Sequence, residues 1–180
     1  MYTCLRGITF VSRSYFYMMS GRIRNRSSIS EALPYFTEGK VIKGFGRGSK
    51  ELGIPTANFS EQVVNLLPAP LETGVYYGWA RVDNDEVYEM VMSIGWNPYF
   101  ANKKRSMETH ILHVFEKDFY GSWLRVYITG YLRPEKNYDS LNDLLRDIHA
   151  DIGNAKSNLA NSHQQLLKTD MRLSRMVELQ

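Results

Sequence analysis

From Gly39 onward, the hydrophobic positions fall into short β-rich runs that are separated by turn signals. Many short runs of this kind in succession are typical of an antiparallel barrel or sandwich. The predicted strands are Lys40–Lys43, Gly74–Val82, Val87–Ile94, Met107–Phe115 and Leu124–Leu132. The Asp83–Asp85 segment predicts a tight hairpin between the second and third strands, and Pro98, which lacks an N–H, predicts a loop over Trp96–Tyr99.

After Pro134 the period changes to three and four residues, which is typical of one apolar stripe on a helix. The stripe consists of Leu141, Leu144, Leu145, Ile148, Ile152, Ala155 and Leu159. Asp139 or Ser140 can cap the start of this helix, and we expect the helix to pack across one side of the barrel. Residues 163–180 predict a further helical piece with a basic face, to which we assign no chemical role.

The stretch from Gly44 to Phe59 concentrates glycines, basic residues and a Pro-Thr-Ala-Asn turn within sixteen residues. The three alternating glycines at its start can take positive φ, so that successive backbone N–H groups can face one anion. Arg47 and Lys50 add positive charge beside them. The spacing fits neither a Walker A loop nor a dinucleotide fingerprint. We interpret the stretch as a phosphate-binding loop, with a flexible hairpin connection as the alternative.

The turn at Pro55 presents two candidate metal ligands, Thr56 and Asn58. Alternate residues of an extended segment share a face, so the two side-chain oxygens can reach one Mg²⁺ ion, which prefers hard oxygen ligands and keeps phosphate oxygens of a nucleotide among them. A turn in which both side chains stabilise their own backbone is the alternative. His110 and His113 are an odd number of residues apart on a predicted strand, so they face opposite sides and do not predict a shared zinc site.

Composition is that of an ordinary globular protein, with 43% hydrophobic residues, 23% charged residues and a formal net charge of +3. This charge permits anionic ligands but does not by itself indicate nucleic acid. Cys4 is the only cysteine, so no intrachain disulfide can form and a reducing compartment is expected. No stretch approaches the roughly 20 apolar residues of a membrane span.

Residues 1–30 carry five arginines and no acidic residue, which is typical of a mitochondrial presequence. The alternatives are a disordered basic tail and a seldom-used upstream start codon.

Several motifs, taken in order, resemble the eukaryotic riboflavin kinase (flavokinase) family over roughly residues 34–160. They are GFGRGSKELGIPTANF at 44–59, TGVYYGWA at 73–80, SIGWNPYF at 93–100, KKRSMETHIL at 103–112, FYG at 119–121 and GYLRPEKNYDSL at 130–141. The resemblance implies a mainly β fold, namely a small closed antiparallel Greek-key-like β-barrel of six strands with a C-terminal α-helix packed on it. It also implies transfer of the γ-phosphoryl group of ATP to the 5′-hydroxyl of riboflavin, which makes FMN, with Mg²⁺ as the metal and Zn²⁺ or Mn²⁺ as substitutes.

The same resemblance assigns roles to individual residues. It makes Glu108 the catalytic base for the ribityl hydroxyl, whereas a glutamate beside lysines is otherwise typical of a surface ion pair. The residues expected to bind ATP are Gly44, Lys50, Thr56, Asn58, Ile111, His113 and Tyr120, of which Thr56 and Asn58 also hold the metal. The residues expected to contact the flavin, in a loop that closes over the site, are Arg133, Lys136 and Tyr138. The aromatic side chains that can line a flavin pocket are Trp96, Tyr99, Phe100, Tyr131 and Tyr138.

The expected organisation is a basic N-terminal extension over residues 1–33, disordered or targeting, a kinase domain over 34–162 and a C-terminal tail over 163–180. We expect a cytoplasmic monomer, or a mitochondrial one if residues 1–30 act as a presequence, with ATP and riboflavin as substrates, ADP and FMN as products, and no nucleic-acid or membrane partner. Because about thirty residues precede the kinase-like region, FMN synthesis without FAD synthesis is expected. Two alternatives stay open: a small barrel that binds single-stranded nucleic acid, and a flavin-binding protein without catalysis.

Overall fold

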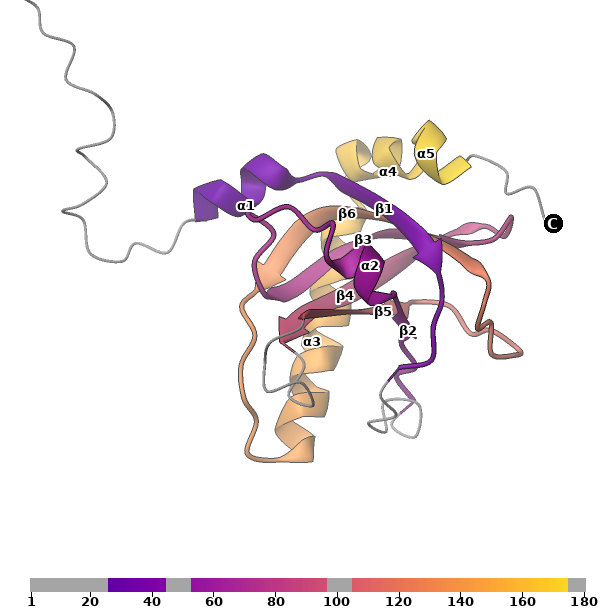
Figure 1. The fold of residues 1–180 in the computed structure, drawn as a ribbon. Coiled ribbons are helices and arrows are strands. Elements are labelled where there is room, and N and C mark those ends of the chain that lie inside the picture. The colour runs from indigo at the N-terminus through magenta and orange to yellow at the C-terminus, as the bar shows by residue number, and fades with distance from the viewer. Residues whose placement is uncertain (1–25, 45–52, 97–104, 175–180) are drawn as a thin grey trace, which may run out of the picture.

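A curled antiparallel sheet is the centre of the computed structural model, which describes residues 26–44, 53–96 and 105–174 (Figure 1). Its strands are β1 Tyr35–Lys40, β2 Ala57–Asn58, β3 Gly74–Val82, β4 Val87–Trp96, β5 Arg105–Ile111 and β6 Trp123–Arg133. Neighbouring strands pair antiparallel in the order β1-β6-β3-β4-β5-β2. Just beyond β1, the Ile42 N–H donates to the Asn58 carbonyl at 2.9 Å, so the sheet closes into a barrel. The predicted six-stranded antiparallel fold is confirmed.

The first strand lies upstream of its predicted position. The pattern of the sequence predicts it at Lys40–Lys43, whereas Tyr35–Lys40 pairs residue by residue with β6. Gly39 permits this close packing, because a Cβ there would lie 2.8 Å from a methyl group of Val63. Within the predicted strand, Ile42 makes only the isolated bridge that closes the barrel. The prediction for this strand was therefore wrong: β1 begins at Tyr35 and ends at Lys40, the residue at which the predicted strand begins.

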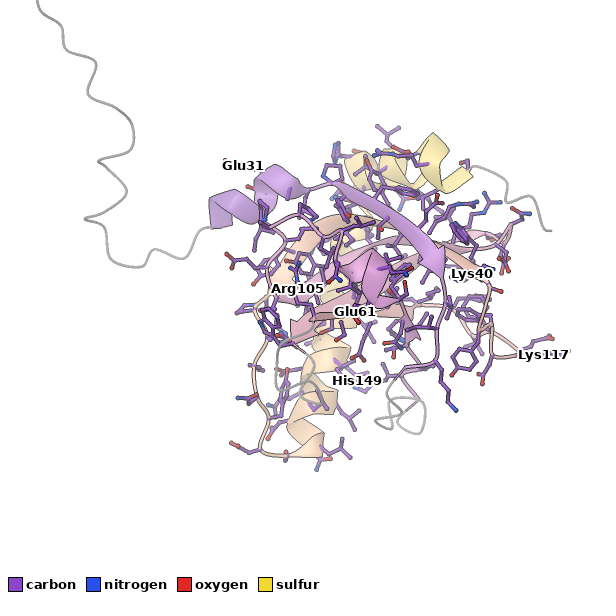
Figure 2. The ribbon with its side chains drawn as sticks, viewed as in Figure 1. Glu31, Lys40, Glu61, Arg105, Lys117 and His149 are labelled. Atoms are coloured by element: carbon purple, nitrogen blue, oxygen red, sulfur yellow. The ribbon has the colours of Figure 1, made fainter. Side chains whose placement is uncertain are left out.

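Strand β5 also differs from its prediction. It runs from Arg105 to Ile111 rather than from Met107 to Phe115. Its first residue is anchored because Arg105 Nη1 donates to the Leu71 carbonyl at 3.1 Å; Figure 2 labels this side chain. Because the chain leaves the ladder after Ile111, His113 lies off the strand, so the prediction that His110 and His113 face opposite sides of one strand is wrong.

Five helices surround the barrel in the described residues: α1 Arg26–Ala32, α2 Glu61–Val64, α3 Leu141–Leu159, α4 Ser162–Lys168 and α5 Met171–Ser174. Helix α3 buries Ala155 and Leu159 and contacts three strands, while its N-terminal half extends beyond the barrel (Figure 1). Its cap is Ser140, whose hydroxyl accepts the Asp143 N–H at 3.1 Å, so one of the two predicted caps is confirmed. Within the described residues, none of the helices combines the length and apolar character that crossing a membrane requires.

The helices at both ends of the described chain pack against the barrel. Ile29 of α1 is buried in the main core, and Leu173 of α5 is fully buried in a second cluster on the outer face of the sheet. That cluster includes Trp79, whose Nε1 donates to the Gln164 carbonyl at 3.1 Å. The packed unit therefore extends on both sides of the predicted 34–162 domain.

Candidate active site

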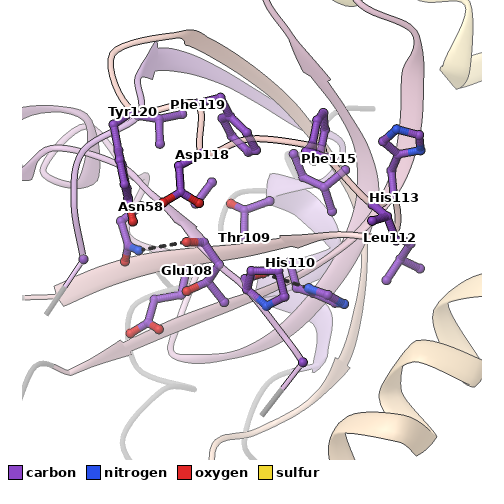
Figure 3. A pocket seen from close by; sticks show the side chains of 18 of the residues that line it. Asn58, Glu108, Thr109, His110, Leu112, His113, Phe115, Asp118, Phe119 and Tyr120 are labelled. Atoms are coloured by element: carbon purple, nitrogen blue, oxygen red, sulfur yellow. Dashed lines mark hydrogen bonds between the residues drawn. The ribbon is translucent and has the colours of Figure 1, made fainter. Parts of the chain in front are cut away.

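A cavity of about 860 Å³ opens where β2 pairs with β5 (Figure 3). Its walls come from the segment after β1, the segment that leads into β2, strand β5 with the connection that follows it, and α3. Seven of the predicted site residues line it: Gly44, Thr56, Asn58, Glu108, Ile111, His113 and Tyr120. Its volume falls in the range of small-molecule sites, so it can hold a nucleotide.

The pairing of β2 with β5 places Asn58 directly opposite Glu108. Opposite residues of an antiparallel ladder point to the same face, with Cβ atoms about 4.5–5.5 Å apart. The next residue of β5, Thr109, is fully buried, whereas Glu108 is half-buried and lines the cavity, so the register keeps Glu108 on the open side of the strand. A slip of one residue would turn this carboxylate into the core. The predicted base therefore lies beside the predicted metal and phosphate ligands.

Asn58 is oriented by the turn that precedes it. Its Nδ2 donates to the Thr56 carbonyl at 3.4 Å, which leaves Oδ1 to accept from or bind a ligand. Gly44 packs against the same amide, since a Cβ at Gly44 would lie 2.5 Å from Nδ2. Gly44 is thus needed for space, and it lacks the positive φ that the sequence analysis assumed. Lys50 lies outside the described residues.

The two histidines of the cavity belong to different walls. His110 Nδ1 lies 2.9 Å from the Pro55 carbonyl and, because a carbonyl only accepts, it is the donor. This bond braces the turn that presents Thr56. His113 instead stacks on Tyr88, with ring centroids 4.0 Å apart and an interplanar angle of 17°. In the part of the chain that the structure describes, no group of three or more His, Cys, Asp or Glu could hold a metal.

Three lysines that the sequence analysis did not single out also line the cavity: Lys43, Lys117 and Lys156. Lys117 lies at the outer tip of the connection between β5 and β6 (Figure 2), and Lys156 comes from α3. Ammonium groups around a cavity favour an anionic ligand such as a triphosphate. These residues gave no signal in the sequence, because nothing distinguishes them among the 22 lysines and arginines of the chain.

Glu135 is a second carboxylate near Glu108 that sequence reasoning missed. It accepts hydrogen bonds from the Trp96 backbone N–H and the Thr73 side chain. Its carboxylate lies over Gly95, where an added Cβ would overlap it. Burial raises the pKa of Glu135, and the nearby charge of Glu108 acts in the same direction. Glu135 thus ties the segment after β6 to the end of β4, next to the predicted base.

The predicted flavin residues Arg133, Lys136 and Tyr138 do not line the cavity and lie against α3 instead. Among the predicted aromatic walls, Trp96 is 49% exposed at the end of β4, whereas Tyr131 packs edge-on against Tyr76, with ring centroids 5.1 Å apart. We therefore assign Tyr131 to the core. The other two predicted wall residues, Tyr99 and Phe100, lie outside the described residues.

The cavity holds the groups that phosphoryl transfer from a nucleotide to an alcohol requires. The Asn58 amide of β2 lies opposite the Glu108 carboxylate of β5, the Thr56 hydroxyl lines the same cavity from the turn before β2, and lysines lie along the walls. Transfer of this kind depends on positioning, on charge and on a base near the hydroxyl. The barrel and its cavity therefore define a small-molecule phosphotransferase.

Comparisons with known proteins agree with this class. The flavokinase family profile, described as riboflavin kinase, matches residues 31–159. Human riboflavin kinase is 60% identical over 138 residues, which cover 77% of this chain and 89% of that protein; mouse riboflavin kinase is 60% identical over 139 residues, covering 77% and 90%. The crystal structure of riboflavin kinase from Trypanosoma brucei matches with a TM-score of 0.63 and 27% identity, over 81% of this chain and 89% of that chain. The chain belongs to the riboflavin kinase family, and its reaction is the riboflavin kinase reaction, which makes FMN.

Proposed function

We propose that the cavity in Figure 3 is where the γ-phosphoryl group of ATP passes to the 5′-hydroxyl of riboflavin. The observation that carries this assignment is the Asn58–Glu108 pair, because it puts a candidate base next to oxygens suited to a metal–triphosphate complex. Phosphoryl transfer passes through a loose transition state, so the protein contributes mainly positioning, charge stabilisation and a base.

Glu108 accepts the proton of the riboflavin hydroxyl as the new O–P bond forms. Its side chain is half-buried in the cavity wall, where it can meet a ligand. A positioned general base contributes about 10² to 10⁴ in rate. Two other carboxylates compete for this role: Glu135, which does not line the cavity and already accepts two hydrogen bonds, and Asp118, which lines it from the connection between β5 and β6 and not from the strand that faces Asn58. The role of base therefore goes to Glu108.

A divalent metal accompanies ATP in phosphoryl transfer of this kind, where it neutralises charge on the phosphate oxygens. Thr56 and Asn58 fit Mg²⁺, because both line the cavity and the Asn58 amide is held with Oδ1 unused by its own turn. The described residues provide no acidic cage, which suits an ion that keeps substrate phosphates among its ligands. Zn²⁺ or Mn²⁺ would act as substitutes at the same oxygens.

The nucleotide lies along the cavity from Gly44, which contacts its phosphates, to the wall that holds Ile111, His113 and Tyr120. Lys50 is a further phosphate contact on the grounds of the sequence alone. Ile111 supplies a buried apolar surface, and the His113–Tyr88 stack presents a flat one. These are the features that an adenine ring requires. The lysines of the rim add charge toward the phosphates.

Riboflavin lies on the other side of Glu108, against the segment that carries Arg133, Lys136 and Tyr138. Glu135 supports this placement, because it joins that segment to the end of β4 beside Glu108. Trp96 provides an exposed aromatic surface at the same end of the strand, with Tyr99 and Phe100 following it in sequence. A neutral, flat ring system fits such a wall.

The remaining assignments concern the whole chain. The kinase unit is centred on residues 34–162, with residues 1–33 as an extension and 163–180 as a tail whose first part packs on the barrel. The protein acts as a monomer in the cytoplasm, or in mitochondria if residues 1–30 are a presequence. N-terminal sequencing of the protein isolated from cell fractions tests the compartment, and sedimentation tests the monomer.

Incubation of the purified chain with riboflavin, ATP and Mg²⁺, followed by chromatography, tests the reaction directly. FMN and ADP in equal amounts are expected, and omission of Mg²⁺ should abolish both. Flavin binding without FMN would instead indicate a non-catalytic flavin-binding protein. Tight oligonucleotide binding without FMN would indicate a nucleic-acid-binding barrel.

A further inference from the structure

Two carboxylates of α3 hold the last residue of β6 and the segment that follows it. Asp147 and Asp151 are four residues apart, so they share one face of the helix, and the segment runs beside the N-terminal half of that helix (Figure 1). Asp151 is buried, with 5% exposure, and binds the Nε–Nη2 edge of the Arg133 guanidinium. Its oxygens accept from Nε at 3.0 and 3.1 Å and from Nη2 at 2.7 Å. A buried charge held this way keeps its partner in one orientation.

Asp147 holds Lys136 and Tyr138, which are the other two predicted flavin contacts. Its Oδ2 accepts from the Tyr138 hydroxyl at 3.1 Å and pairs with the Lys136 ammonium. The Lys136 hydrogen bond lowers the pKa of Asp147. Tyr138 in turn accepts from Arg133 Nη2 at 2.9 Å. The two carboxylates and the three side chains therefore form one continuous network.

The network limits what Arg133 can offer a ligand. A guanidinium has five N–H donors. Nε and both donors of Nη2 go to Asp151 and Tyr138, and one donor of Nη1 goes to the Pro134 carbonyl at 3.1 Å. Within the described residues one Nη1 donor remains. A single donor suits one acceptor atom, whereas a phosphate is held best by two parallel donors.

The charges of the network also bear on which ligand these side chains can bind. The cations Arg133 and Lys136 are each paired with a carboxylate of α3. Arg146, whose Nε lies 3.8 Å from Asp147, also pairs with Asp143 at 2.6 Å, so three cations and three carboxylates are neutral as a set. Together with the one remaining donor, this favours an uncharged polar ligand over an anionic one. Riboflavin is uncharged, while ATP and FMN carry phosphate groups.

We propose that Asp147 and Asp151 are positioning residues for riboflavin: they fix Arg133, Lys136 and Tyr138 so that these side chains meet an uncharged flavin. The inference rests on the proposed flavin contacts of these three residues. Helix α3, which the sequence analysis treated as a packing element, thereby takes part in substrate recognition.

The test compares Asp151→Asn and Asp147→Asn in the full chain, with kinetics for each substrate at saturating levels of the other. Both substitutions keep the side-chain shape and remove the charge. Each should raise the KM for riboflavin by about tenfold, the effect of one lost charge-assisted hydrogen bond, with the KM for ATP and kcat within about twofold of wild type. In an Arg133→Gln background, Asp151→Asn should add no further increase, because it acts through the arginine.

Asp170→Asn is the matched control, since Asp170 pairs with Arg172, which contacts Tyr127 and Phe36 and not the segment after β6. It should lower Tm and leave both KM values unchanged. If the two α3 variants lower Tm but leave the KM for riboflavin unchanged, or raise both KM values equally, the carboxylates only support the fold and the inference is overturned. Asp147→Asn still tests the inference if Asp151→Asn fails to fold, because the Lys136 partner of Asp147 is half exposed, at 50%. Wild-type protein that makes no FMN would overturn the proposed function itself, and is a distinguishable result.

Discussion

Asn58 and Glu108 face each other across the short β2–β5 ladder, although they are separated by a hairpin and two long strands in sequence. The pairing depends on β2, which has only two residues and is held from the other side by Ile42. The bridge that closes the barrel therefore also holds the two residues of the proposed site in place. A change that opens this bridge should damage catalysis before it damages the rest of the fold.

Gly44→Ala should weaken ATP binding while the barrel stays folded. An added Cβ would lie 2.5 Å from Asn58 Nδ2, so the amide must turn away from its present position. We expect the KM for ATP to rise roughly threefold to tenfold, equivalent to about 0.7–1.4 kcal/mol. Gly153→Ala is the control, because nothing lies within 4 Å of that position and helix propensity favours alanine. Equal KM values in the two variants would contradict the role of Gly44.

Thr56→Ala should raise the Mg²⁺ concentration needed for half-maximal activity. The hydroxyl is a proposed metal ligand, and the Asn58 amide alone would then hold the ion against the nucleotide. A shift of about tenfold at fixed ATP is expected, which corresponds to about 1.4 kcal/mol. Titration of activity with Mg²⁺ measures it. An unchanged metal requirement would remove Thr56 from the ligand set.

Thr129→Val should stabilise the protein and leave activity unchanged. Thr129 lies at the irregularity where β6 pairs with β3 between Ile128 and Gly130, and its buried hydroxyl makes no hydrogen bond within the described residues. Replacing an unsatisfied hydroxyl by a methyl group of similar shape is worth about 1 kcal/mol. Thermal unfolding should show an increase in Tm of a few degrees. A lower Tm would mean that the hydroxyl has a partner.

Stability should fall in acid partly through Asp170. The Arg172 hydrogen bond lowers the pKa of Asp170 to about 2 from its ordinary 3.8. Because the folded pKa lies below the unfolded one, the stabilisation is present above the unfolded value and is lost as pH falls through 3.8 toward 2. Urea unfolding between about pH 5 and pH 2 should show wild type losing on the order of 1 kcal/mol more than Asp170→Asn. Parallel curves would argue against the pair.

Much of the fold could be predicted because local chemistry determines it. The Gly74–Val82 strand, the Asp83 hairpin with its positive φ of 47°, and the Ser140 cap all follow from patterns within a few residues. Strand β2 could not be predicted in this way, because two residues carry no periodicity and the strand exists only through its partners in β5 and at Ile42.

The residues around the cavity also fall into those that sequence motifs predict and those whose contacts only the tertiary structure shows. Thr56, Asn58 and Glu108 were predicted because their motifs resemble a family, and the cavity brings them together. Glu135 and Asp151 were not predicted, since a glutamate in a charged loop and an aspartate between apolar helix positions have the pattern of solvated groups. Only the tertiary structure shows that one lies over Gly95 and that the other is buried on Arg133.

Replacement of the proposed base tests the central claim most directly. In Glu108→Gln the carboxamide keeps the shape of the side chain but cannot take a proton. Steady-state kinetics should show kcat lower by about 10²- to 10⁴-fold, with KM values for ATP and riboflavin within about threefold of wild type. Glu86→Gln, at the exposed end of the β3–β4 hairpin, should match wild type. A Glu108→Gln variant with wild-type kcat would contradict the account.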